Sequence, residues 1–87
     1  MSAPTSTGVR AAVEVLARAL TDRPDEVAVV ESQHNATTLL ELYVAPGELG
    51  KVIGRLGRTA TALRTLAATA GEREGKTVTL EIREGRP

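Results

Sequence analysis

The sequence predicts an α+β domain in which a mixed, three-stranded sheet has its helices packed on one face. The 87 residues suffice for one small domain. Along the chain, apolar residues are spaced at helical and strand periods in the order α-β-β-α-α-β. A short turn joins the first two strands, so these should be antiparallel. Helices join the last two strands, and a right-handed crossover should make that pair parallel.

A first helix is predicted to begin at Val9. Its apolar stripe recurs at steps of four, three and four residues, at Val9, Val13, Leu16 and Leu20. The helix should end before Pro24, because proline lacks the N–H that would continue the hydrogen-bond ladder. Residues 1–8 are mostly small and polar, and we expect them to form a disordered tail.

Two strands form the expected hairpin. Residues 27–32 are rich in β-branched side chains, and the polar run at 33–36, which contains His34, predicts the turn. The next strand, at 38–45, alternates one apolar set with a mixed set: Leu40, Leu42 and Val44 against Leu39, Glu41 and Tyr43. This alternation predicts one fully covered face and one partly covered face.

A helix, a loop and a second helix follow. Pro46-Gly47-Glu48 is typical of a helix start and leads into about two turns of helix. Glycines at 54 and 57 bracket an interruption, after which helical spacing continues until Gly71 supplies the expected stop. After a polar turn at 72–75, the last strand alternates Val78, Leu80 and Ile82 with polar residues. We place the domain at 9–83 and a C-terminal tail at 84–87.

Composition excludes several classes of function. The chain has no cysteine, which removes disulfides, thiolate metal sites and thiol nucleophiles and favours a reducing cytoplasm. Its apolar runs fall short of the roughly 20 residues that span a bilayer, and its N-terminus lacks a signal-peptide pattern, so neither membrane insertion nor secretion is expected. Tyr43 is the only aromatic residue, which argues against binding nucleic acid on rows of aromatic rings.

Positive charge is concentrated in one segment. The formal net charge is zero, but residues 11–48 hold seven acidic and two basic side chains, whereas residues 49–71 hold four basic side chains and no acidic one. The second segment therefore predicts a local anion site on a chain whose long-range attraction for polyanions is weak.

Residues 50–58 are the predicted site. Gly54 and Gly57 permit positive φ and lack a Cβ, so backbone amides can approach a phosphodiester chain at the N-terminus of the following helix. Arg55 at the loop tip, Arg58 in the first helical turn and Lys51 one turn before the loop surround this cradle with positive charge.

At these residues the chain resembles a KH domain, whose mark is an Ile-Gly-x-x-Gly loop between two helices. The matching residues are Ile53-Gly54-Arg55-Leu56-Gly57, and the element order is that of the type II arrangement. Asp25-Glu26-Val27, Val44-Ala45-Pro46 and Gly50-Lys51-Val52 extend the likeness to the small bacterial KhpA family over about residues 9–83. This resemblance implies a cytoplasmic RNA chaperone or post-transcriptional regulator that dimerises and pairs with a second KH protein of the KhpB (Jag) type.

The resemblance also implies roles for individual residues. The loop glycines would hold RNA phosphates, and Ile53, together with Ala60, would form an apolar floor for unstacked bases. Leu56 departs from the family pattern, which commonly has a polar residue there, and we expect it to contact a base or a protein partner. The implied RNA-binding set is Gly50, Lys51, Ile53, Gly54, Arg55, Leu56, Gly57 and Arg58.

Other chemistry is poorly supported. The glycines match neither of the nucleotide-binding patterns G-x-x-x-x-G-K-[ST] and G-x-G-x-x-G. His34 has no second metal ligand nearby in the sequence, and Arg64 and Arg73 are interpreted as solvated surface charges. No nucleophile and base can be assembled, so we expect neither catalysis nor a metal or cofactor.

The sequence therefore predicts a non-catalytic module that binds about four nucleotides of single-stranded RNA beside the 54–57 loop. The alternative is a protein-interaction subunit with the same fold that acts mainly through a partner. Leu56 and the acidic remainder of the chain favour this alternative.

Overall fold

The computed structural model of the protein describes residues 8–87. Its elements are α1 (Gly8–Leu20), η1 (Pro24–Glu26), β1 (Ala28–His34), β2 (Thr37–Val44), α2 (Leu49–Ile53), η2 (Arg55–Gly57), α3 (Arg58–Arg73) and β3 (Thr77–Glu84), where η denotes a short 3₁₀ turn. The predicted order α-β-β-α-α-β is confirmed. The tail expected at 1–8 lies, apart from Gly8 at the start of α1, outside the described residues.

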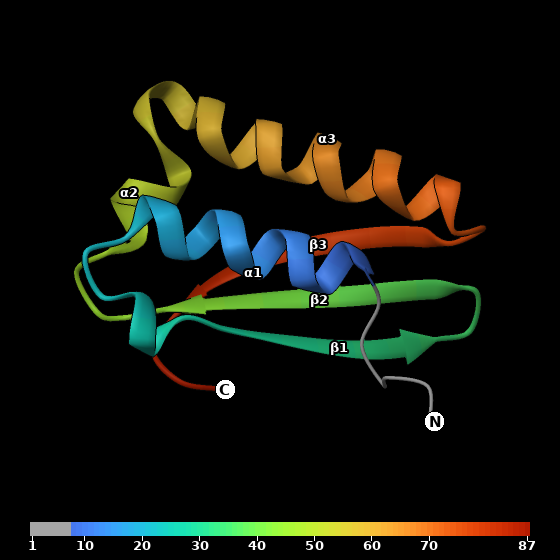
Figure 1. Ribbon diagram of the computed structural model, residues 1–87, viewed down its shortest axis with the longest axis horizontal. Helices are drawn as coiled ribbons and strands as arrows, with labels where there is room; N and C mark the ends of the chain where they lie inside the picture. The colour runs from blue at the N-terminus through green and yellow to red at the C-terminus, as the bar shows by residue number, and fades with distance from the viewer. Residues whose placement is uncertain (1–7) are drawn as a thin grey trace.

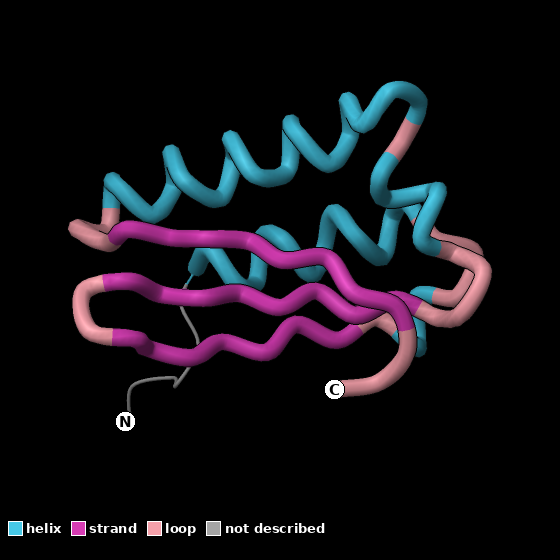
Figure 2. The backbone as a smooth tube through the Cα atoms, turned by 180° about the vertical axis from the view of Figure 1, so that it is seen from behind, coloured by secondary structure: helices cyan, strands magenta, loops and turns pink. Residues whose placement is uncertain are grey.

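The molecule has two layers. The sheet has the strand order β1-β2-β3 and forms one layer, and α1 and α3 run along the same face of it (Figure 1). Seen from behind, the three strands lie side by side in front of α1 (Figure 2). β1 pairs antiparallel with β2 and β2 pairs parallel with β3, so the predicted mixed sheet is confirmed.

The core lies between the sheet and the two long helices. On β2, Leu40, Leu42 and Val44 are fully buried, which confirms the predicted alternation. The facing residues come from α1 and α3: Val9, Val13, Ala17, Leu63 and Ala67. Because each fully buried leucine or valine stabilises the fold by about 1.5–3 kcal/mol, this set fixes α1 and α3 on the sheet. None of the described helices is long and apolar enough to cross a membrane.

The hairpin turn is shorter than the sequence predicts. β1 continues through His34, and the turn consists of Asn35 and Ala36 alone. Asn35 has a φ of 58°, a left-handed conformation that asparagine adopts more readily than most residues and that tight hairpins require. The expected turn at 33–36 is therefore wrong in length, because polar side chains at an exposed strand end resemble a loop in sequence.

Gly71 does not end α3, which continues to Arg73. Gly71 is buried, and a Cβ built on it would lie 2.4 Å from Cγ2 of Val78 on β3. The glycine therefore allows α3 to approach β3 closely and is not a helix stop.

The turn before α2 is tied to the end of β3. The Gly47 N–H donates to the Glu84 carboxylate at 2.9 Å, and the Gly85 N–H donates to the Val44 carbonyl at 2.8 Å. α2 begins at Leu49, so Pro46 and Gly47 form a turn before the helix and not its predicted first turn. The division of the chain into a domain at 9–83 and tails on either side stays a prediction.

Candidate nucleic-acid interface

The 54–57 loop joins α2 to α3 at one end of the molecule (Figure 1). Gly54 has φ 77° and ψ 171°, a region that is essentially accessible to glycine alone. A Cβ on Gly54 would also lie 2.2 Å from Oγ1 of Thr59. Backbone conformation and packing therefore both require glycine at this position.

The second half of the loop is left-handed. Gly57 has φ 72° and ψ 12°, and a Cβ on it would meet nothing within 4 Å. Leu56 has φ 58° and ψ 22°, which costs a residue with a Cβ roughly 1–2 kcal/mol. Its side chain is 81% exposed. The loop tip therefore carries an apolar side chain that the fold leaves in contact with water.

The N-terminal end of α3 faces the same loop. The first-turn amides of a helix have no acceptor within the helix. At the start of α3 the Arg58 N–H donates to the Arg55 carbonyl, and Gly57 in the capping position supplies no side chain for the amides that follow. The aligned peptide dipoles of α3 add about half a positive charge at this end. These amides therefore attract an anion next to the loop.

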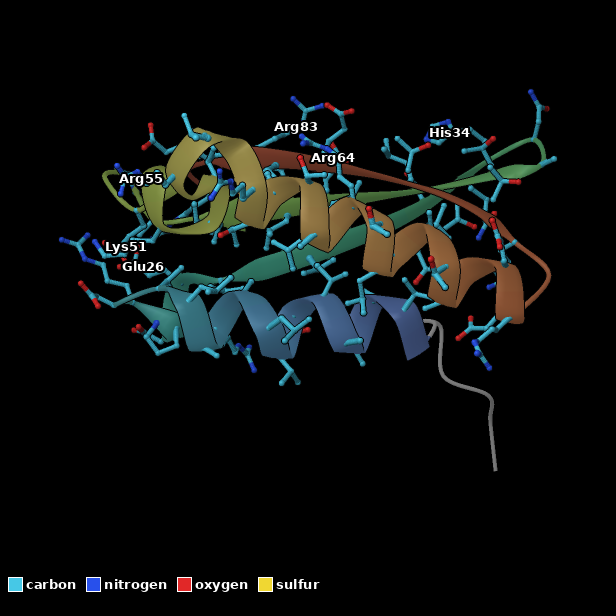
Figure 3. The ribbon with its side chains drawn as sticks, turned by 90° about the horizontal axis from the view of Figure 1, so that it is seen from above. Glu26, His34, Lys51, Arg55, Arg64 and Arg83 are labelled. Atoms are coloured by element: carbon cyan, nitrogen blue, oxygen red, sulfur yellow. The ribbon has the colours of Figure 1, made fainter. Side chains whose placement is uncertain are left out.

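Two of the predicted cations are uncompensated. Arg55 and Arg58 are exposed and, over residues 8–87, take part in no ion pair or hydrogen bond through their side chains. Arg55 projects from the loop end of the molecule (Figure 3). The structure thus brings two unpaired guanidinium groups together with the loop glycines and the start of α3.

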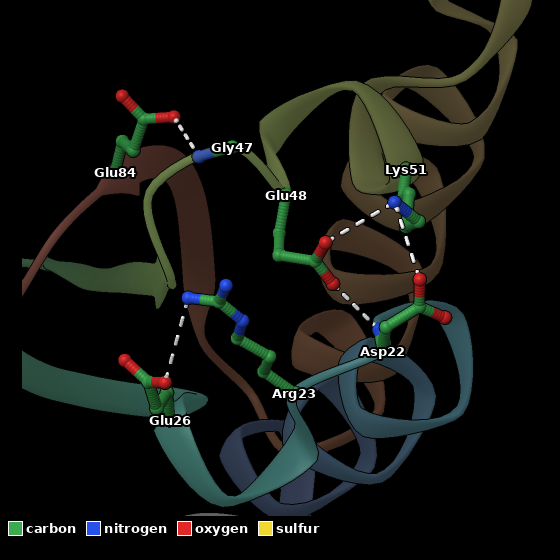
Figure 4. Close-up of polar contacts among 7 residues, drawn as sticks. All are labelled: Asp22, Arg23, Glu26, Gly47, Glu48, Lys51 and Glu84. Carbon is green, nitrogen blue, oxygen red and sulfur yellow. Dashed lines mark hydrogen bonds and ion pairs between the residues drawn. The ribbon is translucent and has the colours of Figure 1, made fainter.

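Lys51 belongs to a different cluster. Its Nζ lies 3.1 Å from Oε2 of Glu48 and 3.4 Å from Oδ2 of Asp22 (Figure 4). Oε1 of Glu48 accepts a hydrogen bond of 2.5 Å from the Asp22 backbone N–H. Lys51, Glu48 and Asp22 form what we call the α1–α2 clamp, because they join the end of α1 to the start of α2. Lys51 is compensated by two carboxylates, whereas Arg55 and Arg58 are not.

The α1–α2 clamp changes the acidity of two of its members. The Asp22 N–H and the Lys51 ammonium donate to the Glu48 carboxylate and lower its pKa. The hydrogen bond to Glu48, together with the negative charges of Glu48 and Asp22, raises the pKa of Lys51. Both groups thus stay charged around neutral pH. Since α2 has only five residues and is too short to be stable alone, the clamp helps to fix the point from which the loop departs.

The remaining predicted residues lie beside the loop. Ile53 is partly exposed at the end of α2, and Gly50 is exposed, with open space where a Cβ would lie. Ala60 is only 2% exposed and belongs to the core. The expected apolar floor is therefore Ile53 without Ala60, because the helical turn from Arg58 directs Ala60 inward.

Arg64 is exposed, as the sequence interpretation expects of a surface charge, but it also contacts the sheet. This residue reaches from α3 to β3, where its Nε lies 3.4 Å from the Leu80 carbonyl oxygen. Figure 3 places it on the side of the molecule away from Lys51. Helical spacing contains the signal: Arg64 follows the buried Ala60 by four residues and precedes the buried Ala67 by three, so it flanks the buried stripe of α3.

Known families and proteins resemble this chain over most of its length. The family described as KhpA/KhpB, KH domain, matches residues 10–82. A protein named RNA-binding protein KhpA from Aquifex aeolicus is 50% identical over 72 residues, which cover 83% of this chain and 91% of that protein. Proteins of the same name from Clostridium acetobutylicum and Chlamydia muridarum are 47% and 48% identical, covering 80% and 77% of this chain and 93% and 86% of theirs.

A solved structure has a similar fold. A crystal structure of Era from Aquifex aeolicus superimposes with a TM-score of 0.63 at 17% identity, covering 99% of this chain and 33% of the Era chain. This likeness concerns the fold alone. The extent of the family match, the identity to the three relatives and the glycine-bracketed loop between two helices lead to one conclusion: the chain belongs to the KhpA/KhpB family of KH domains.

Proposed function

We propose that the protein binds single-stranded RNA at the 54–57 loop and performs no catalysis. The observation that carries this proposal is the pair of uncompensated guanidinium groups, Arg55 and Arg58, beside two glycines and the N-terminal end of α3. The relatives are named as RNA-binding proteins, which supports it. Over residues 8–87, no group of three histidine, cysteine or acidic residues could hold a metal ion, and the family is not enzymatic.

Phosphate contacts dominate the proposed complex. A KH loop holds about four nucleotides by their backbone, so affinity depends on few phosphates and falls with salt. With a net charge of zero, one copy binds weakly. A dimer or a second KH protein of the KhpB (Jag) type supplies further contacts. The family resemblance makes a cytoplasmic RNA chaperone or post-transcriptional regulator the expected cellular role.

The test replaces Arg55 and Leu56 by aspartate. Both side chains are exposed, and aspartate tolerates the left-handed conformation at 56 better than leucine does, so the variant should fold. Fluorescence anisotropy with labelled single-stranded RNA should give an affinity at least about 100-fold lower, because three units of negative charge are added beside the phosphates.

A matched control adds the same charge elsewhere. Arg73→Asp with Ala36→Asp places it at exposed positions at the opposite end of the molecule (Figure 1). This control should keep most of the RNA affinity. Equal losses in both double variants would contradict a role for the loop and would point to net charge alone.

A second candidate function is a protein-interaction subunit with little RNA affinity of its own. The exposed Leu56 favours it, since an apolar loop tip suits a protein contact better than a phosphate. The same RNA titration separates the two candidates. Under this second candidate the wild-type chain already binds RNA negligibly, so the double-aspartate variant causes no further loss of RNA affinity.

A further inference from the structure

The two outer strands of the sheet differ in how their free edges are covered. β1 and β3 are the outer strands, and β1 forms the lower edge of the sheet in Figures 1 and 2. Every second residue of an outer strand directs its N–H and carbonyl groups away from the sheet, where another extended chain can bind them. At the β3 edge, the Arg64 side chain donates to the Leu80 carbonyl at 3.4 Å. No described helix or strand lies beyond β1.

β1 lacks the features that usually protect an outer strand from further pairing. Such strands are commonly very short, interrupted by a bulge, or fitted with proline or lysine. β1 has seven residues, Ala28–His34, each aligned with one residue of β2, and it contains neither proline nor lysine. Its only carboxylate, Glu31, lies at the centre of the strand. The strand is therefore able to accept a further strand along its whole length.

The surroundings of β1 are acidic. Asp25 and Glu26 lie in η1, directly before the strand. Asp25 is exposed and takes part in no ion pair within residues 8–87, and Glu26 pairs with Arg23 at the long distance of 3.9 Å. Together with Glu31, these carboxylates repel a polyanion. The acidic edge therefore disfavours RNA and favours an occupant with positive charge.

Glu31 also disfavours a second copy of this chain at the β1 edge. Two β1 strands related by a two-fold axis would pair antiparallel, and full overlap of Ala28–His34 would place Glu31 opposite Glu31. Like charges directly opposite each other in a sheet are destabilising, whereas opposite charges stabilise the pair. The favoured occupant therefore carries lysine or arginine across from Glu31.

The neighbours of Glu31 favour apolar side chains in the occupant. Side chains alternate between the two faces of a sheet, so Val29 lies with Glu31 on the helix side, where it packs against the core, and Val30 lies on the other face. Both valines are only partly buried. A neighbouring strand with apolar residues across from Val29 and Val30 would cover their remaining exposed surface.

We propose that β1 binds an extended, basic peptide segment of a different protein, which adds to the three-stranded sheet as a further strand. Backbone hydrogen bonds to β1 give the affinity, and the side chains across from Val29, Val30 and Glu31 give the specificity. This function goes beyond RNA binding and does not depend on it.

The β1 edge is separate from the other surfaces of the molecule. The 54–57 loop leads into α3, which packs against β3, the outer strand on the other side of β2. Leucines of α1 and α3 border an apolar groove of about 300 Å³ on the helix side. A peptide on β1 therefore leaves the loop open, so that the protein can hold RNA and a second protein at the same time.

The first experiment titrates the isotope-labelled full chain with the capped peptide Lys-Thr-Thr-Lys-Val-Val-Lys. In an antiparallel pairing its central lysine falls across from Glu31. Residue-resolved amide hydrogen exchange should slow at alternate residues of β1 and stay unchanged at 54–57 and in β3. A peptide with glutamate in place of the central lysine should bind roughly tenfold more weakly, because a favourable cross-strand pair becomes a repulsive one.

The second experiment tests the backbone hydrogen bonds without changing the protein. Successive N–H groups of an extended peptide point to opposite sides, so methylating alternate nitrogens blocks one edge of the peptide and leaves the other intact. Of two peptides methylated in the two alternate frames, one should lose binding and the other should keep it. Equal behaviour of the two peptides would overturn strand addition, and so would exchange protection located away from β1.

Charge exchange in the protein provides a matched control. Glu31→Lys should bind the lysine-centred peptide roughly tenfold more weakly and should prefer the glutamate-centred one. Glu81→Lys makes the same charge change at an exposed position of β3 and should alter the affinity by less than about twofold. Equal weakening in both variants would overturn the pairing with Glu31. If Glu31→Lys fails to fold, the methylated peptides still decide the matter.

The outcomes separate this proposal from the RNA-binding proposal. A wild-type chain that shows no saturable binding at the highest soluble peptide concentration would overturn peptide binding at β1 and would leave RNA binding by the loop unaffected. Conversely, the double-aspartate loop variant should lose RNA and keep its affinity for the peptide.

Discussion

Positive charge lies within α2 and in the loop that follows it, and the two sets of cations differ in their partners. In the middle of α2, Lys51 is held by Glu48 and Asp22 at 3.1 and 3.4 Å. Beyond the C-terminal end of α2, Arg55 and Arg58 have no partner within residues 8–87. In the sequence, the cations at 51, 55 and 58 form one basic run. In the structure, the first anchors the helix and the other two face solvent.

The difference shows which charge is available to a ligand. A compensated ammonium must break its ion pairs before it binds phosphate, whereas an unpaired guanidinium has only water to lose. The α1–α2 clamp and the 54–57 loop therefore have complementary roles. The α1–α2 clamp orients a helix that is too short to hold itself, and the loop presents the charge.

The largest effect is expected at the glycine with which the loop begins. Gly54→Ala should lower the free energy of unfolding by about 3 kcal/mol, because it combines a backbone region closed to alanine with a clash against Thr59. Gly57→Ala meets open space and should cost only about 1–2 kcal/mol. Denaturant unfolding measures both, and equal losses would mean that backbone conformation alone selects glycine in the loop.

The next effect compares the two kinds of cation directly. Arg55→Met should reduce the slope of log Kd against log salt for single-stranded RNA by about 0.7, the value for one phosphate contact. Lys51→Met removes the same charge four residues earlier and should leave the slope unchanged, although it lowers the melting temperature. Anisotropy titrations at several salt concentrations measure the slope. A reduced slope in Lys51→Met would mean that Lys51 also contacts RNA phosphate, and would contradict the distinction between the compensated lysine and the uncompensated arginines.

The smallest effect concerns the acid stability of the clamp. Because the folded-state pKa of Glu48 lies below its ordinary value of 4.5, its ionised form adds stability above that value, which is lost as the pH falls through the folded-state pKa. Glu48→Gln keeps a hydrogen-bond acceptor but not the charge. It should melt below the wild-type temperature at pH 7, and the gap should close as the pH falls through that folded-state pKa.

Asp25→Asn is the control for this measurement, since Asp25 is exposed and outside the clamp. Thermal melts followed by circular dichroism give the difference in melting temperature between wild type and each of the two variants. A gap between wild type and Glu48→Gln that persists unchanged at acid pH would show that shape, and not charge, explains the role of Glu48.

Glycine and polar residues were the least predictable from sequence. Gly71 has the sequence context of a helix stop, but the reason for it is Val78 on a strand that comes later in the chain. His34 lies in a polar run and nevertheless extends β1, because pairing with Thr37 continues the ladder. Both errors have one cause: the deciding contact comes from a different element.

Periodicity by itself determined the order of the elements, the buried face of β2, the parallel and antiparallel pairings and the glycine-bracketed loop, because each depends on residues a few positions apart or on a general rule of chain connection. The tertiary structure alone decided which cations are unpaired and that leucines of α1 and α3 border one groove. Asp22 lies 26 residues from Glu48, and Leu16 and Leu66 are on different helices. Only packing against the sheet brings such residues together, and the local spacing of residues in the sequence does not predict these contacts.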